Sequence, residues 1–141
     1  MVSEDSPQSE PAKQRWAAVQ SRVFGHDRPA PRMISTEAEA AFFTFVNNEV
    51  WAGVWDRPGL DMSTRRAVTI TALIALGHPD GLALHVRGAL ADGMSAEEIS
   101  EIVLHCTLYC GVPAGAAAYR AIRPLLADAA PPQGATGIAD P

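Results

Sequence analysis

Two histidines, His85 and His105, are the side chains of this sequence best suited to proton transfer. Each is surrounded by apolar residues at helical spacing, so each side chain projects from a largely apolar helix face. An imidazole changes charge near neutral pH and can serve as a hydrogen-bond donor or a general acid. The competing interpretation for each is a core or interface histidine satisfied by one hydrogen bond. Because helices joined by a short turn pack as antiparallel neighbours, we expect both histidines to reach one pocket.

A fixed cation is the second requirement for chemistry on a carboxylate, and Arg57 is the preferred candidate. A guanidinium binds a carboxylate through two parallel hydrogen bonds. Arg57 lies in a predicted loop that Pro58 stiffens. The remaining arginines of the helical segments are interpreted as solvated or ion-paired surface residues, namely Arg65, Arg66, Arg87, Arg120 and Arg123.

The cysteines have the spacing Cys106-x-x-x-Cys110, which places both thiols on one helix face. Their parallel Cβ directions suit a disulfide badly, so we predict small apolar core residues and no redox centre. The spacing of His78, His85, His105 and the cysteines matches no recognised zinc pattern, and no metal site is predicted.

Six helices must position these side chains. The first is predicted over residues 13–24 and ends at Gly25, and an extended connector follows over 26–34. A capping box of Thr36 and Glu39 opens a long helix that runs to Trp55. The segment 56–59 stops it. The next helix, from Asp61 or Ser63 to Gly77, is predicted to be the buried centre of the fold through Val68, Leu73, Ile74 and Leu76.

Three more helices follow over residues 79–92, 95–110 and 113–126. The second of these opens with a full capping box, Ser95 to Glu98, and should turn five residues inward, namely Ile99, Ile102, Val103, Cys106 and Tyr109. No strand pattern occurs, so the fold class is all-α, a bundle of about six helices. We expect one helical domain over 12–127 between tails at 1–11 and 128–141.

Composition excludes several functional classes. The chain has 141 residues, 48% of them hydrophobic, which suits one domain with a substantial core. No apolar run approaches the roughly 20 residues of a membrane span, and the net charge of −5 without a basic block argues against nucleic acid. The N-terminus lacks the features of a secretory signal, which predicts a cytoplasmic protein.

Several motifs together resemble the carboxymuconolactone decarboxylase family over residues 49–123. They are Trp51-Ala-Gly-Val-Trp55-Asp-Arg-Pro-Gly-Leu-Asp61, Thr64-Arg65, Ala-Leu-His85-Val-Arg-Gly-Ala-Leu, Ala-Glu-Glu-Ile and Leu-His105-Cys-Thr-Leu-Tyr-Cys-Gly-Val-Pro-Ala114. The resemblance implies a helical bundle of the alkylhydroperoxidase D-like type that assembles as a homotrimer or homohexamer, with active sites lined by neighbouring subunits. It also implies loss of CO2 from 4-carboxymuconolactone without cofactor or metal.

Under this resemblance, His85 and His105 are expected to stabilise the dienolate left by CO2 and to return a proton, in an order that the sequence leaves open. The expected substrate-binding set is Arg57, Trp55, Tyr109 and Gly53, for a small carboxylate or lactone. The redox branch of the fold uses a Cys-x-x-Cys pair before the histidine. His78 and Gly81 stand at those positions here, so peroxidase activity is not expected.

Two departures from the family pattern leave other functions open. Gly53 stands where the family usually has a glutamate, and residues 20–25 lack a paired arginine. The alternatives are a non-redox tailoring enzyme of a biosynthetic pathway, such as a cyclase, isomerase or dehydratase, and a binding or assembly subunit without catalysis.

Overall fold

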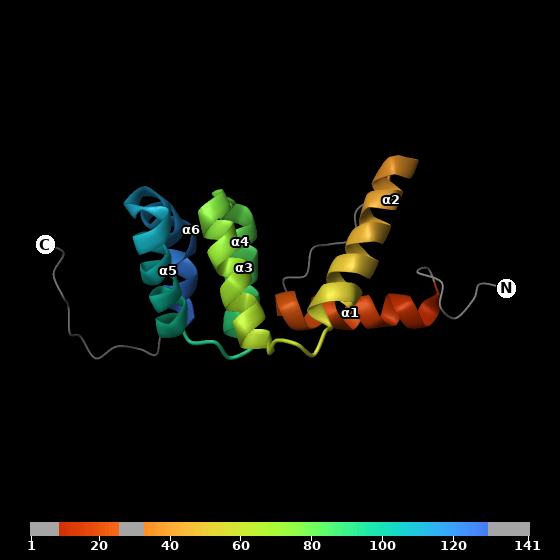
Figure 1. Ribbon diagram of the computed structural model, residues 1–141, viewed down its shortest axis with the longest axis horizontal. Helices are drawn as coiled ribbons and strands as arrows, with labels where there is room; N and C mark the ends of the chain where they lie inside the picture. Colours follow the sequence, from red (N-terminus) through yellow and green to blue (C-terminus); the bar gives the residue numbers. More distant parts are fainter. Residues whose placement is uncertain (1–8, 26–32, 130–141) are drawn as a thin grey trace, which may run out of the picture.

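A computed structural model of the protein describes residues 9–25 and 33–129, and every regular element within these ranges is helical (Figure 1). In chain order the helices are α1 (Glu10–Phe24), α2 (Glu37–Phe45), η2 (Val46–Trp55), α3 (Met62–Leu76), α4 (Pro79–Ala91), α5 (Ala96–Cys110) and α6 (Val112–Ala129). The predicted all-α class is therefore confirmed. None of the described helices has the length and apolarity needed to cross a membrane.

Helix α1 begins three residues before the predicted start at Lys13. The Ser9 hydroxyl accepts a hydrogen bond from the amide of Ala12, and Pro11 occupies the first turn, where its missing N–H is harmless. At the other end of the chain, α6 continues to Ala129. Helical residues thus extend slightly beyond both predicted domain limits, 12 and 127. The rest of the two predicted tails and most of the 26–34 connector lie outside the described residues.

The predicted long helix before Trp55 exists, but its second half is a π-helix. Thr36 caps the start by accepting from the amide of Glu39 at 3.1 Å, while the Glu39 carboxylate accepts from the amide of Ser35. The hydrogen-bond pattern changes at Val46, and η2 continues as a π-helix to Trp55. Hydrophobic spacing over ten residues does not distinguish this winding from an α-helix, so the π-helix could not be predicted from the sequence.

Helices α3 to α6 form a bundle around one hydrophobic core (Figure 1). Asp61 caps α3, and the predicted capping box of Ser95 and Glu98 is present at α5 with both hydrogen bonds. The buried core residues come from all four helices: Ile70, Ile74, Leu82, Val86, Ala89, Ile99, Val103, Cys106, Ala118 and Ile122. Of the helices joined by short connections, α3 packs on α4 and α5 packs on α6, whereas α4 packs on α6 and not on α5, the neighbour that its short turn predicted.

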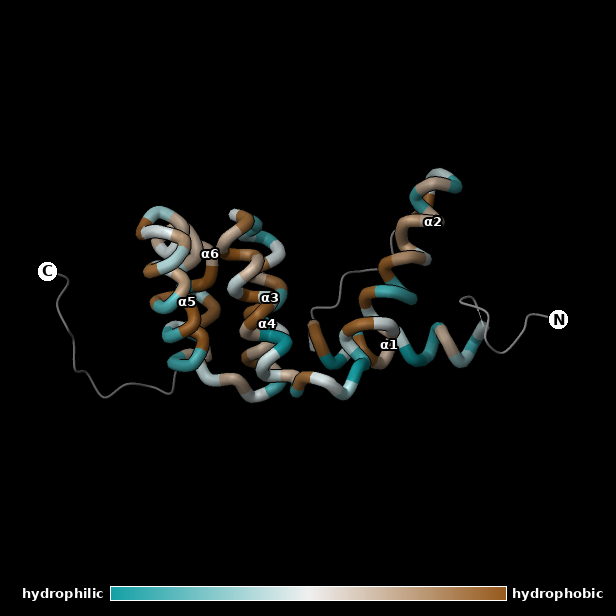
Figure 2. Tube along the Cα trace, in the orientation of Figure 1, coloured by the Kyte–Doolittle hydropathy of each residue, from teal (hydrophilic) through white to brown (hydrophobic). Residues whose placement is uncertain are grey.

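A second, smaller core joins α1, η2 and the side of α4. Its buried members are Val19, Val23, Phe24 and Trp51, and Leu84 of α4 packs against them. The rod made of α2 and η2 stands away from the bundle and meets α1 at its base (Figure 1). Figure 2 shows hydrophobic residues along this rod as well as inside the bundle, and among the described residues Phe42, Phe45 and Val54 of the rod are 51% to 59% exposed.

Three residues predicted to point inward are exposed instead. Val68 and Leu76 of α3 are 59% and 68% exposed, and Tyr109 of α5 is 75% exposed. The face of α3 that enters the core carries Arg66, Ile70 and Ile74, at the four-residue spacing of one helix side. A helix that is apolar on most sides leaves the buried side undetermined until its neighbours are known.

Candidate active site

The imidazole of His85 is held between aromatic rings from two other helices. On one side the Trp55 indole is stacked on it, with ring centroids 5.9 Å apart and planes at 18°. On another side Phe24 meets it edge-on at 5.1 Å, and Phe24 also packs edge-on against Trp51. Trp55, named from the sequence as a candidate substrate-binding residue, thus lies beside His85, and Phe24 and Trp51 complete the aromatic cluster.

Three helices position this cluster, and each contributes one or two of its side chains. Helix α4 carries His85, the last turn of α1 carries Phe24, and η2 carries the two tryptophans. Trp51 and Trp55 are four residues apart, and their ring centroids are 6.0 Å apart. This pair lies on the side of η2 that faces α1 and α4, where Trp55 stacks on His85 and Trp51 packs on Phe24.

Burial determines the charge of His85. Desolvation, and secondarily the positive charge of Arg66, lower its pKa from 6.5 to about 4. The side chain is accordingly neutral at pH 7. Its Nδ1 atom is buried and has no hydrogen-bond partner. An imidazole nitrogen without a partner in an apolar setting is unfavourable, so this atom is available to a group that enters the site.

His105 lies in a different environment on the outer face of α5. It is exposed, and the Tyr109 ring packs against it with centroids 5.1 Å apart. It lines an open groove of about 390 Å³ between α3 and α5, together with Ala67, Thr71, Glu101 and Ile102. His105 and Tyr109 therefore form a second, solvent-facing pair.

Within one chain the two histidines do not share a pocket, contrary to the prediction. Helix α4 packs on α1, α3 and α6, whereas α5 packs on α3 and α6. The aromatic contacts of His85 are with α1 and η2, and that of His105 is within α5. A short turn joins α4 to α5, but each of them packs on α3 and α6 instead of on the other, so the turn does not bring the two histidines together.

Arg57 and Gly53 flank the aromatic cluster along the chain. Arg57 is exposed in the loop after η2, and its carbonyl accepts a 2.7 Å hydrogen bond from the Arg65 guanidinium. Gly53 is exposed within η2. A Cβ atom at position 53 would lie 2.9 Å from the carbonyl oxygen of Asn48, five residues earlier. The π-helix therefore leaves no room for a side chain there without a backbone shift.

Sequence reasoning missed one charged residue beside the site. Arg66 was interpreted as a surface arginine, yet only 2% of it is exposed. Its place on the same helix side as Ile70 and Ile74 was the available signal. Phe24 was also missed, because a last-turn aromatic residue gives no sign of the helix it will contact.

The cysteines agree with their prediction. Both are free, Cys106 is buried, and its Sγ lies 3.5 Å from the Thr71 hydroxyl oxygen. Cys110 packs against the same core. In the described part of the chain, no three His, Cys, Asp or Glu side chains are grouped as metal ligands would be.

Comparison with known proteins places these residues in a family. The sequence profile of the carboxymuconolactone decarboxylase family matches residues 37–124, from the start of α2 into α6. The chain is 46% identical over 77 residues to 4-carboxymuconolactone decarboxylase of Acinetobacter baylyi, which covers 55% of this chain and 58% of that protein. It is 44% identical over 63 residues to nitrosuccinic acid decarboxylase of Metarhizium robertsii, which covers 45% of this chain and 44% of that protein.

A third relative has no assigned activity. It is an uncharacterized 15.0 kDa protein of Paracoccus denitrificans, 40% identical over 70 residues, which are 47% of this chain and 52% of that protein. The chain thus spans about half the length of the curated relatives it matches. Helix α1, which supplies Phe24, lies outside the residues matched by the family profile.

Proposed function

The chain belongs to the carboxymuconolactone decarboxylase family, and we propose that it removes CO2 from a small carboxylic acid. The observation that carries the proposal is a neutral histidine with an unpaired buried nitrogen, held in an aromatic cluster. Two of the similar proteins are named as decarboxylases of chemically different acids, so the general reaction is better supported than a substrate.

The reaction requires a place for the electron pair that CO2 leaves behind. In a conjugated lactone such as 4-carboxymuconolactone, this pair moves onto the lactone carbonyl and gives a dienolate, which then takes a proton at carbon. A hydrogen-bond donor aimed at the developing oxyanion contributes about 3 to 4 kcal/mol, and a positioned general acid about 10²- to 10⁴-fold in rate. The proposed reaction uses no cofactor, because the substrate itself accepts the electrons.

His85 is assigned the oxyanion role. A neutral imidazole carries one N–H, which donates to an oxyanion without itself being a cation. Its low pKa makes His85 a poor proton donor at neutral pH, since almost none of it is protonated there. The indole of Trp55 and the ring of Phe24 exclude water from two sides of the imidazole, which strengthens the hydrogen bond it makes.

His105 is then assigned the proton-donor role, and we propose that it comes from a second copy of the chain. His105 and Tyr109 face solvent, and three neighbouring apolar side chains on the same exposed side, Leu104, Leu108 and Val112, are 58% to 77% exposed. Exposed apolar surface of this kind is typical of an interface. Seating it against the aromatic cluster of another copy would bring the two histidines together, as expected for a homotrimer or homohexamer.

Arg57 is assigned the role of binding the substrate carboxylate that is not lost as CO2. It follows Trp55 by two residues, and its backbone is held by Arg65. The first substrate to test is 4-carboxymuconolactone. Because position 53 is a glycine, the site lacks the glutamate side chain that the family pattern has there. If the lactone is not consumed, this difference favours a bulkier or less polar acid as the substrate.

The central test measures CO2 release from 4-carboxymuconolactone and related conjugated acids by the full chain. His85→Ala and His105→Ala should each lower kcat at least about 10²-fold, the contribution of one oxyanion donor or one general acid. His78→Ala, a change at an exposed histidine outside both groups, should leave kcat unchanged. Normal turnover by both variants would overturn the site assignment.

The shared-site proposal has a sharper test. If His85 of one copy works with His105 of another, refolding the two inactive variants together should restore part of the activity, because mixed oligomers contain some sites with both histidines. Each variant refolded alone should stay inactive. Failure of the mixture to recover any activity, with mixed oligomers verified by mass, would show that the histidines do not cooperate across copies.

A further inference from the structure

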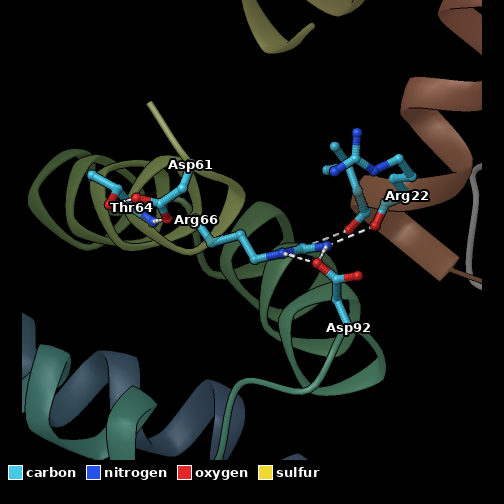
Figure 3. Close-up of polar contacts among 6 residues, drawn as sticks. Arg22, Asp61, Thr64, Arg66 and Asp92 are labelled. Atoms are coloured by element: carbon cyan, nitrogen blue, oxygen red, sulfur yellow. Dashed lines mark hydrogen bonds and ion pairs between the residues drawn. The ribbon is translucent and has the colours of Figure 1, made fainter. Parts of the chain in front are cut away.

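The side chain of Arg66 ties three helices together beneath the aromatic cluster. It extends from α3, is buried, and donates to the carbonyl oxygens of Arg22 at 2.6 Å and Val23 at 2.9 Å in the last turn of α1. It also donates to the Asp92 carboxylate after α4, at 3.2 and 3.3 Å (Figure 3). Four hydrogen bonds compensate a burial that would otherwise be strongly unfavourable.

The two carbonyls it binds belong to the end of a helix, where the last four carbonyl oxygens have no partner within the helix. Arg66 therefore fixes where α1 ends in space. The guanidinium is planar and reaches both carbonyls at once, which sets the rotation of the last turn as well as its position. A lysine ammonium can also donate to carbonyls, but it lacks the rigid planar fork and would hold the rotation of this turn less firmly.

The same turn of α1 rests directly on α4 at Gly88. A Cβ atom at Gly88 would overlap the carbonyl oxygen of Val23, the same carbonyl that Arg66 holds. Gly88 follows His85 by three residues, so it lies on the same side of α4. The contact between α1 and α4 is thus made backbone to backbone, one turn from the histidine.

The residue after Val23 is Phe24, whose ring meets the His85 imidazole at 5.1 Å. From this connection we infer that Arg66 is a positioning residue for His85, acting through the end of α1 and the ring of Phe24. Its four hydrogen bonds go to the carbonyls of Arg22 and Val23 and to the Asp92 carboxylate, and none goes to the His85 imidazole. The field of its guanidinium acts on His85 in the same direction as burial does. The catalytic meaning of this role rests on the proposed function, but the positioning itself does not.

The test compares Arg66→Gln and Arg66→Lys with the parent chain by nuclear magnetic resonance. Glutamine is neutral and can hold only one carbonyl of α1, so the nuclear Overhauser contact between the Phe24 and His85 rings should weaken. The titration midpoint of His85 should rise by about one pH unit, because water reaches the ring and the positive charge of Arg66 is gone. Lysine keeps the charge, so the ring contact should weaken with a smaller rise of the midpoint. Arg120→Gln, a change at an exposed arginine of α6, should alter neither.

A purely stabilising role predicts a different outcome. The folded Arg66→Gln protein would then unfold more easily but keep the parent's ring contact, and the folded Arg66→Lys protein, which keeps the charge, would keep both the ring contact and the His85 midpoint; this result would overturn the proposal. If both Arg66 variants fail to fold, Phe24→Leu keeps Arg66 and its carbonyls and removes only the ring edge. An unchanged His85 midpoint in Phe24→Leu would equally overturn it.

Activity gives an independent reading. Where the parent removes CO2 from a test acid, Arg66→Gln should lower kcat about tenfold and leave KM nearly unchanged, because Arg66 positions the oxyanion donor without contacting substrate. Absence of decarboxylation in the parent would count against the proposed function while leaving the magnetic resonance result intact. An unchanged ring contact in the variants would count against the positioning role alone.

Discussion

The imidazole of His85 is stacked on the indole of Trp55, with their planes at 18° and their centroids 5.9 Å apart. The two residues come from helices far apart in sequence, α4 and η2, and their stacking joins the rod of α2 and η2 to the bundle. The indole covers the histidine face and helps to keep its nitrogen from water. The chemistry available to His85 therefore depends on how η2 is wound and where α1 ends.

Stability should fall at mildly acid pH because of His85. Its pKa is about 4 in the folded chain and 6.5 for an ordinary histidine, so the unfolded chain binds more protons between these values. Stability is complete above about pH 6.5 and is lost as pH falls toward 4, by at most about 3 kcal/mol. Urea unfolding near pH 7 and near pH 5 should show a larger loss for the parent than for His85→Gln. Equal losses would mean that His85 is not held neutral.

Gly88→Ala should strongly destabilise the protein. Its Cβ would meet the backbone of Val23, which cannot move without releasing the end of α1. Overpacking against backbone costs about 1 to 3 kcal/mol or more, so the denaturant midpoint should fall clearly. Gly81→Ala on the same helix is the matched control. Its Cβ would meet the end of the Leu73 side chain, which can turn away, and stability should change little.

Gly53→Ala should disturb the π-helix. The new Cβ would lie 2.9 Å from the carbonyl of Asn48, so the segment must shift its backbone or rewind. We expect a loss of about 1 to 3 kcal/mol and an altered near-ultraviolet circular dichroism signal from the adjacent tryptophans. Gly59→Ala, at a position with open space around it, should change neither. Unaltered spectra in Gly53→Ala would mean that η2 accommodates a side chain.

Arg57→Gln should weaken substrate binding in any decarboxylation the chain performs. Loss of a charged hydrogen-bonding partner for the remaining carboxylate should raise KM about tenfold, with a smaller change in kcat. Arg123→Gln on α6 provides the control for loss of an exposed arginine. Steady-state kinetics with one acid and both variants checks this. An unchanged KM in Arg57→Gln would remove Arg57 from the proposed site.

Leu108→Glu should separate the copies of the chain. Leu108 is 77% exposed beside His105 and Tyr109, and burying a new carboxylate in an apolar interface is unfavourable. Sedimentation of the parent should give a multiple of the 14.9 kDa chain mass, and that of the variant a smaller species. Arg123→Glu, a charge change away from these residues, should sediment like the parent. A parent that sediments at the single-chain mass would contradict the shared site.

Several features of this protein were determined by its sequence alone. Caps at Thr36, Asp61 and Ser95 and the glycines after α1 and α3 located most helix ends, because these signals act within a few residues. The motif spacing around His85 and His105 identified the family.

Only the tertiary structure decided which faces meet. It buried Arg66 while leaving Tyr109 in solvent, brought Phe24 to His85, wound residues 46–55 as a π-helix and separated the two histidines that sequence reasoning had joined. Helix periodicity defines an apolar side but not the element that packs against it. A charged residue such as Arg66 is buried only where hydrogen-bond acceptors from other parts of the chain, here two carbonyls and a carboxylate, lie within its reach. These contacts join residues far apart in the sequence, so no local residue pattern predicts them.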